Sequence, residues 1–190
     1  ETQLGGDSVP DDVWHRVVHI VTNNRDIQEH AAQASWDALN LPSWNEKTVR
    51  VAGYLLGEFG HLISENVRSS PIHQLEALRS KFGYCSAQTK SLLLNTFAKF
   101  ASEYPQLLAP LLSDLFDEYS CSFDVEVAQR ATEYLALNEC AVPELITNVL
   151  AEMPIYPQES ENTLEQKQER KKKKREKREK KKRKKKKRKK

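Results

Sequence analysis

The sequence predicts an all-α fold in which about four antiparallel helix pairs stack as an α-solenoid. Apolar residues recur at helical spacing in eight segments, and no segment shows the alternation typical of a strand. The first helices of successive pairs begin near residues 10, 46, 87 and 124. These intervals of about 36–41 residues are close to the period of HEAT and armadillo repeats. Because each pair needs neighbours to bury its apolar surface, a stack is favoured over a compact bundle.

Cap residues and helix breakers define the first pair. Ser8 and Pro10 predict the start of the first helix, since Ser caps free N–H groups and Pro fits the first helical turn. Its apolar residues are Val13, Val17, Ile20 and Val21. Asn23 and Asn24 end this helix. Asp26 with Glu29 predicts a capping box for the second helix, which Pro42 ends.

The third helix is predicted over residues 46–64, and its wide apolar surface indicates packing on more than one side. Gly53, Gly57 and Gly60 lie inside it, where each costs about 1 kcal/mol relative to Ala. We expect close contact with a neighbouring helix to offset that cost. The fourth helix begins at Ser70-Pro71 and ends before Gly83.

Four more helices complete the expected array. Ser86 begins the fifth, and Pro105 opens the sixth, which Pro110 is expected to bend or interrupt. Asp124 caps a seventh helix through about residue 137, and an eighth runs from Pro143 to just before Pro154. Trp14, Trp36 and Trp44 are expected in core and inter-repeat packing rather than in an exposed binding surface.

Charge divides the chain into an acidic body and a basic tail. Twenty of the 30 Lys and Arg residues, but only three of the 27 acidic residues, lie in residues 167–190. That segment therefore carries a formal charge of +17, and residues 1–166 carry −14. We expect a frayed lead-in at residues 1–8, a helical trunk at 9–153, and a disordered hinge and polybasic tail at 154–190.

The tail is the strongest candidate binding segment in the sequence. Like charges one turn apart disfavour a helix, so the segment is expected to stay extended. Such a segment suits an anionic membrane or a nucleic acid. A nuclear-localisation signal, or a low-complexity extension without an evolved partner, remains an alternative. The candidate contacts are Lys171, Lys172, Lys173, Lys174, Arg175, Lys181, Lys182, Arg183, Lys184 and Arg188.

Signs of catalysis, metal or cofactor binding are weak. His15 and His19 are four residues apart on one helix, which is a metal-ligand spacing, but no further Cys or His completes a site. The sequence has no nucleophile elbow and no phosphate-binding glycine loop. We therefore expect no enzyme activity, no metal and no cofactor. A hydrolase would rest only on scattered His and Cys residues.

The sequence also bears on the cellular compartment. Cys85, Cys121 and Cys140 are few and widely spaced, which suits a reducing cytosol. We identify no signal peptide, and no apolar run approaches the roughly 20 residues of a membrane span. Met153 is the only methionine, so we interpret the chain as a fragment or processed product.

Several short segments of the chain are distinctive. The most specific are GYLLGEFG at residues 53–60, QRATEYL at 129–135 and LAEMP at 150–154. Others are DDVW with RVV at 11–18, VTNN at 21–24, SSP at 69–71, LLLNT at 92–96 and DVE at 124–126. Taken in this order, they resemble the alpha-adaptins, which are large subunits of the plasma-membrane clathrin adaptor (adaptor protein complex 2). The resemblance covers roughly residues 5–160.

The resemblance implies the C-terminal part of an adaptin trunk. It implies assembly with a second large chain, a medium chain and a small chain, and work with clathrin-coat machinery at coated pits on the cytosolic face of the plasma membrane. None of the family's lipid or cargo contacts falls on this segment. The near-continuous run of basic residues departs from the family pattern. The alternative function is a helical-repeat protein whose tail binds nucleic acid at the ribosome or nucleolus.

Overall fold

A computed structural model describes residues 12–140 and 142–156, and within them it contains eight α-helices, three short 3-10 helices and no strand. The all-α prediction is therefore confirmed. The α-helices are α1 (Asp12–Asn23), α2 (Gln28–Leu39), α3 (Glu46–Phe59), α4 (Pro71–Phe82), α5 (Ala87–Glu103), α6 (Pro105–Ser120), α7 (Val125–Asn138) and α8 (Pro143–Val149). The 3-10 helices are η1 (Arg25–Ile27), η2 (Gly60–Ile63) and η3 (Val67–Ser69). The expected lead-in at residues 1–8 and the cap at Ser8 and Pro10 lie outside the described residues.

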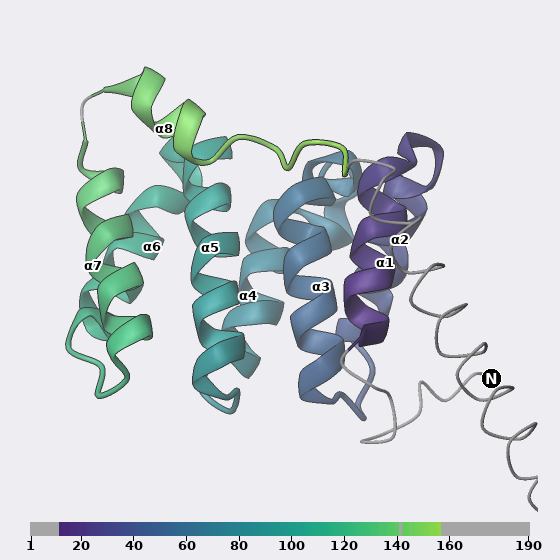
Figure 1. Ribbon diagram of the computed structural model, residues 1–190, viewed down its shortest axis with the longest axis horizontal. Helices are drawn as coiled ribbons and strands as arrows, with labels where there is room; N and C mark the ends of the chain where they lie inside the picture. The colour runs from purple at the N-terminus through teal and green to yellow at the C-terminus, as the bar shows by residue number, and fades with distance from the viewer. Residues whose placement is uncertain (1–11, 141, 157–190) are drawn as a thin grey trace, which may run out of the picture. The chain divides into compact units, whose positions relative to one another are not determined.

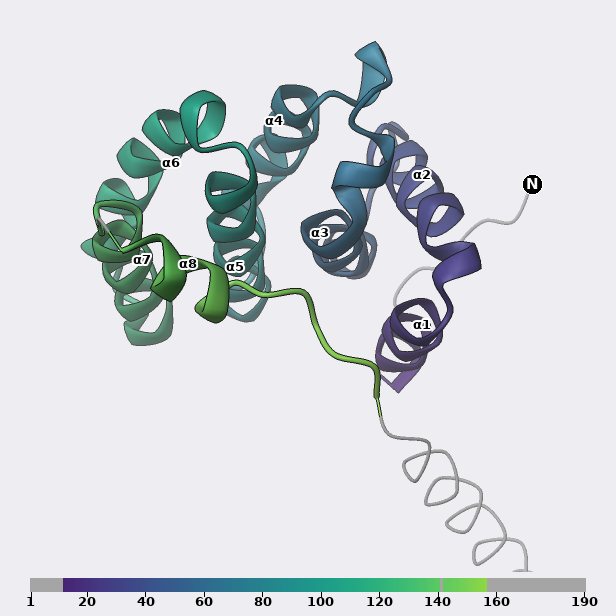
Figure 2. The ribbon, with the colours of Figure 1, turned by 90° about the horizontal axis from the view of Figure 1, so that it is seen from above.

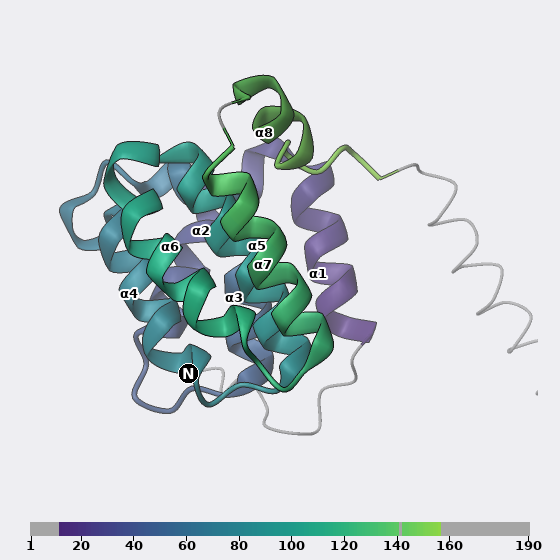
Figure 3. The same cartoon turned by 90° about the vertical axis from the view of Figure 1, so that its left-hand side faces the viewer.

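The helices form two layers. Helices α1, α3, α5 and α7 stand side by side in one layer, and α2, α4 and α6 form the other (Figures 1 and 2). Each odd-numbered helix contacts the next, as the even-numbered helices also do, so successive antiparallel pairs stack like repeats. Figure 3 views this stack from the α7 side, with α8 across the end of the layers. The described helices belong to one compact unit that ends at Pro154; of the next unit, only Ile155 and Tyr156 are described.

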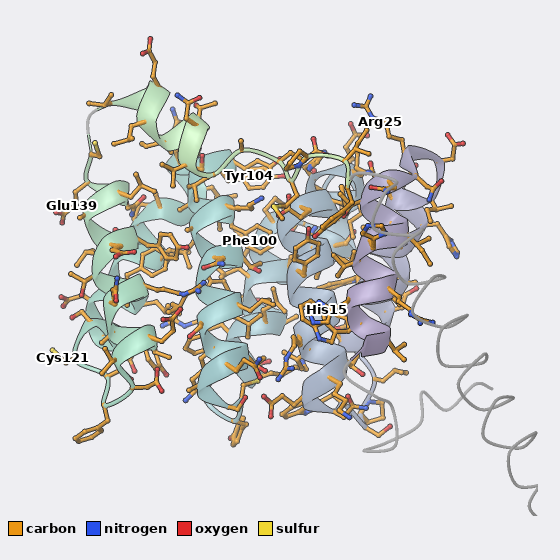
Figure 4. The ribbon with its side chains drawn as sticks, viewed as in Figure 1. His15, Arg25, Phe100, Tyr104, Cys121 and Glu139 are labelled. Atoms are coloured by element: carbon orange, nitrogen blue, oxygen red, sulfur yellow. The ribbon has the colours of Figure 1, made fainter. Side chains whose placement is uncertain are left out.

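The turns lie at two opposite edges of the stack. Turns within a pair, marked by Arg25 and Tyr104 in Figure 4, lie at the edge near α8. Turns between pairs, one of which contains Cys121, lie at the other edge (Figure 4). We call these the intra-pair edge and the inter-pair edge.

Aromatic side chains fill the core between the two layers. The largest fully buried side chains include Phe59, Phe82, Phe97, Phe100 and Phe116. The Phe82 ring contacts Phe97 at 5.5 Å and meets the Tyr119 ring edge-on at 4.8 Å, which joins α4, α5 and α6. Trp36 belongs to this core, and Trp44 packs against it, as the sequence predicted.

The glycines of α3 allow a close approach by its neighbours. A Cβ atom on Gly57 would lie 3.1 Å from the side chain and 3.3 Å from the Cα atom of Thr96 in α5. A Cβ atom on Gly53 would overlap Leu93 of α5, and one on Gly60 would overlap Gln74 of α4. The packing explanation for these glycines is therefore confirmed.

Four details of the helix boundaries differ from the expectation. The Asp26–Glu29 capping box is wrong, since η1 occupies Arg25–Ile27 and the N-terminus of α2 has no side-chain cap. Instead, the Gln28 side chain donates hydrogen bonds to the carbonyl oxygens of Val21 and Thr22, which close the turn. Pro110 does not interrupt α6, which runs from Pro105 to Ser120 with Pro110 at an exposed position inside it.

The other two differences lie at C-terminal helix ends. Helix α3 ends at Phe59 and continues only as η2, where Gly60 begins the tighter turn. Helix α8 ends at Val149, and residues 150–156 have no helical structure. In both places, backbone groups beyond the α-helix bond to side chains of other helices: Gly60 O accepts from Gln74, Ala151 O accepts from Lys99, and Met153 N–H donates to Glu58.

Candidate interaction surfaces

Polar side chains join α3 to α5 near the inter-pair edge. The Glu46 carboxylate accepts hydrogen bonds from the Ser86 backbone N–H at 3.1 Å and from the hydroxyls of Ser86 and Thr89. Arg50, one turn after Glu46, donates to the same Thr89 hydroxyl at 3.0 Å. Because all these groups bond across the pair boundary, they fix the register of one helix pair on the next.

These bonds also determine how Glu46 ionises. Burial raises the pKa of the Glu46 carboxyl, but the hydrogen bonds from Ser86 and Thr89 and the charge of Arg50 lower it by more. The net pKa lies below the ordinary value of 4.5. The carboxylate is therefore the form that the folded array stabilises.

A corresponding polar group joins α5 to α7. The Asn95 side-chain oxygen accepts hydrogen bonds from Arg130 at 2.7 Å and from the Tyr134 hydroxyl at 2.6 Å. Arg130 also pairs with Glu126 at 2.6 Å. Burial raises the pKa of the Tyr134 phenol, which stays a hydrogen-bond donor at neutral pH. At both boundaries a basic residue thus bonds to a polar side chain of α5: Arg50 of α3 to Thr89, and Arg130 of α7 to Asn95.

The two ends of the stack differ in surface chemistry. On α1, a stripe of apolar side chains at positions i, i+4 and i+7 is exposed: Val13 by 41%, Val17 by 36% and Ile20 by 52%. The exposed side chains of α7 are mainly polar, namely Glu126, Gln129, Thr132 and Glu133, beside the apolar Val125 and Ala136. A polar outer face is typical of a terminal repeat, whereas an apolar stripe suits a further packing partner.

Aromatic residues also recur along the inter-pair edge. Trp44, Tyr84 and Phe123 each lie in one of the three loops that join successive pairs. Trp44 is half-buried and its ring lies 6.3 Å from that of Tyr84, which is mostly exposed. Phe123 is fully exposed. The prediction that the tryptophans pack in the protein thus holds for Trp44. That prediction did not include Tyr84 and Phe123, which are exposed aromatic residues on the same edge and which we call the inter-pair row.

Two clefts open between the helices of the last pairs. One of about 440 Å³ lies between α5, α6, α7 and α8, and its lining contains no charged side chain, His or Cys. The other, of about 410 Å³, lies between α5 and α7. Its charged groups are already bonded, because Asp124 caps the N–H of Val127 and Glu126 pairs with Arg130. Neither cleft presents the converging titratable groups that catalysis uses.

The structure bears on the His15–His19 spacing, from which we expected no metal site, and not on the predicted tail contacts. In the described part of the chain, no three His, Cys, Asp or Glu side chains gather in a way that holds a metal ion. The His15 ring stacks on Trp14 with 3.8 Å between ring centroids. All ten basic candidate residues between Lys171 and Arg188 lie outside the described residues, so their role stays a prediction.

No helix within residues 12–140 and 142–156 combines the length and the apolar character that crossing a bilayer requires.

Stacked helix pairs, register-fixing polar bonds and exposed apolar surfaces together define a helical-repeat scaffold protein. Comparison with known families makes the class specific: residues 2–141 match the adaptin N terminal region. This match spans most of the chain, which therefore belongs to the adaptin family, a family of non-enzymatic adaptor subunits. The resemblance drawn from the sequence segments is confirmed at this level.

Individual relatives agree with the family match. The chain is 44% identical over 161 residues to the AP-2 complex subunit alpha-2 of Dictyostelium discoideum, covering 83% of this chain and 16% of the relative. It is 41% identical over 135 residues to the AP-2 complex subunit alpha of Schizosaccharomyces pombe, covering 71% of this chain and 15% of the relative. It is 37% identical over 168 residues to the AP-2 complex subunit alpha-1 of Arabidopsis thaliana, covering 86% of this chain and 16% of the relative. The chain thus spans about one sixth of these relatives' length.

Proposed function

We propose that this chain is a trunk segment of the alpha subunit, a large subunit of the plasma-membrane clathrin adaptor. In this role it acts by protein–protein assembly in clathrin-mediated endocytosis and intracellular protein transport. The observation that carries the proposal is the 44% identity over 161 residues to an AP-2 complex subunit alpha-2. The all-helical array and its bonded, non-catalytic clefts agree with a scaffold role.

The proposed partners are the other adaptor subunits, namely a second large chain, a medium chain and a small chain, together with clathrin-coat machinery. The proposed location is the cytosolic face of the plasma membrane at clathrin-coated pits. The exposed surfaces suited to assembly are the α1 stripe of Val13, Val17 and Ile20 and the inter-pair row of Tyr84 and Phe123. Rigid polar bonds between pairs suit a part that must hold its partners in fixed positions.

Within the adaptin N terminal region, we place the chain in the C-terminal part of the trunk. The family match ends at residue 141, yet the Arabidopsis relative is matched over 86% of the chain, so that similarity extends beyond residue 141. The polar outer face of α7 and the apolar stripe of α1 support the same placement, because they suit the last and an internal position in a stack. The trunk would then occupy residues 9–153. A hinge and the polybasic tail would together occupy residues 154–190.

Co-purification tests the assembly proposal. A tagged full-length protein that contains this segment should recover the other three adaptor subunits from cells, and should colocalise with clathrin in discrete spots at the plasma membrane. A matched form with Ile20→Asp and Val17→Asp should recover less of them if the α1 stripe helps to build the trunk. Recovery of no adaptor subunit by the unsubstituted protein would reject the proposal.

The composition of residues 167–190 favours one second candidate, a tail that binds nucleic acid instead of an anionic membrane. The test compares the intact chain with a chain that stops at Gln166, using RNA and anionic vesicles at about 150 mM salt. Tail-dependent binding to RNA but not to vesicles supports the nucleic-acid function. Tail-dependent binding to vesicles with weak RNA binding supports a membrane contact, and equal binding by both chains removes the tail from either role.

A further inference from the structure

After α8, residues 150–154 run back across the ends of α5 and α3 at the intra-pair edge (Figures 1 and 2). We call residues 150–154 the C-terminal strap. Leu150 packs partly buried against the core, while Met153 is 40% exposed. Since the side chains of the strap bury little surface, its position depends on its main-chain contacts.

Those contacts go to one charged pair. The Glu58 side chain on α3 is only 5% exposed and forms an ion pair with Lys99 on α5, which is 17% exposed. Lys99 Nζ also donates a hydrogen bond of 3.1 Å to the carbonyl oxygen of Ala151. The second Glu58 oxygen, Oε2, accepts a hydrogen bond of 3.1 Å from the backbone N–H of Met153.

The geometry suits recognition of an extended main chain. The pair offers one donor and one acceptor, and the strap presents a carbonyl and an N–H two residues apart. Hydrogen bonds to charged groups are about twice as strong as neutral ones. A buried carboxylate with an unused oxygen is costly, so the Met153 N–H also satisfies Glu58.

We propose that Glu58 and Lys99 form a main-chain clamp that binds the C-terminal strap and thereby holds α8 over the cleft between α5, α6 and α7. Most described side chains of α8 are exposed, among them Leu145 and Val149, so this short helix has little packing of its own. Ile146, Thr147 and Leu150 form its contribution to the lining of the 440 Å³ cleft. Release of the strap would therefore free the side of this cleft that α8 lines.

The clamp joins two segments that lie far apart in the sequence. Glu58 lies in GYLLGEFG and Met153 in LAEMP, the segments on which the family resemblance rests most strongly. In the structure, each supplies one partner of the same hydrogen bond. This inference does not rest on the proposed endocytic function, because it concerns a contact within the chain.

Hydrogen exchange followed by mass spectrometry on the full chain tests the clamp. Met153→Pro removes the backbone N–H that donates a hydrogen bond to Glu58. Met153→Leu is the matched control, because leucine retains this N–H. We expect exchange in residues 143–153 to become about tenfold faster or more in Met153→Pro, because a bond to a charged acceptor is lost. Exchange within α5 should stay unchanged, which shows that the array remains folded.

Glu58→Gln provides a second route to the same result. It keeps the side-chain shape but removes the charge that attracts both Lys99 and the strap. Faster exchange confined to residues 143–153 in both Met153→Pro and Glu58→Gln supports the clamp. Equal exchange there in Met153→Pro and Met153→Leu overturns it, as does faster exchange spread over all helices in Met153→Pro.

Discussion

The hydroxyl of Thr96 in α5 donates a hydrogen bond of 2.8 Å to the carbonyl oxygen of Gly53 in α3. Thr96 is 3% exposed, and its side chain also lies against Gly57. The hydroxyl reaches a main-chain carbonyl of the preceding pair because neither glycine carries a side chain. Packing and hydrogen bonding therefore depend on one another at this boundary.

Replacing Thr96 by Val should lower the free energy of unfolding by about 1 kcal/mol, because Val keeps the shape but leaves the Gly53 carbonyl without this donor. Urea denaturation measures the change. Thr132→Val is the matched control. Thr132 is exposed, and its hydroxyl donates a hydrogen bond to the Ala128 carbonyl oxygen within α7. Equal losses in the two variants would show that the bond to Gly53 has no special role.

Substituting Ala for Gly57 should destabilise the protein by roughly 1–3 kcal/mol, because the new Cβ atom meets the Thr96 Cα atom, which cannot turn away. Gly83→Ala should be neutral or stabilise by up to about 1 kcal/mol. A Cβ atom there has no neighbour within 4 Å, and the Gly83 φ of −59° suits any residue. Thermal unfolding followed by circular dichroism compares the two, and a stabilising Gly57→Ala would contradict the packing argument.

Removing the positive partner of Glu58 should be among the most damaging polar changes. Lys99→Met leaves a buried carboxylate unpaired and should cost about 3–5 kcal/mol of stability. Glu126→Gln breaks a pair whose carboxylate side chain is 58% exposed, so we expect a loss below about 1 kcal/mol. Denaturant midpoints measured for both variants test the contrast, which fails if the two losses are similar.

Glu46 should make stability depend on pH in the acid range. Its folded pKa lies below the unfolded value of 4.5, so its contribution is fully present above pH 4.5 and disappears as pH falls through the folded pKa. The stability difference between the unsubstituted chain and Glu46→Gln should therefore be constant near neutral pH and shrink on acidification. Glu76→Gln, at an exposed position, is the control. A difference that grows as pH falls would refute the assignment.

The α1 stripe predicts different effects in different contexts. In this chain, Ile20 is 52% exposed, so Ile20→Ser should change stability by less than about 0.5 kcal/mol. In the full-length protein, the same change should lower the melting temperature if a further helix pair of the trunk packs on the stripe. Ala136→Ser on the outer face of α7 should be silent in both. An unchanged melting temperature of the full-length Ile20→Ser protein would show that the α1 stripe is not part of a trunk interface.

The helices were predictable because their signals are local. Asn45 and Asp124 act as N-caps. Their side chains accept hydrogen bonds from the backbone N–H groups of Thr48 and Val127, respectively. Of these two caps, only Asp124 was predicted from the sequence. Pro71, Pro105 and Pro143 each begin a helix. The Asp26–Glu29 prediction failed because a nearby Gln28 side chain closes the turn in another way.

The contacts that join distant segments could not be predicted in this way. Periodicity marks the buried face of a helix, but it does not indicate which polar residue on one helix meets which on another. The positions of the α3 glycines imply close packing, but nothing in the sequence indicates that Thr96 fills the space. Glu58 carried no signal at all, because its partner Met153 lies 95 residues away and bonds through the main chain.

The length of that chain segment has a consequence for mechanics. Neighbouring pairs contact one another across some 40 residues, whereas the Glu58–Met153 bond closes a far longer loop, so it should form after the helices have stacked. A force that pulls on the chain beyond residue 156 reaches this bond before it reaches α8 or α7. The strap would thus yield first and lengthen the connection, while the stacked helices beneath it stay folded.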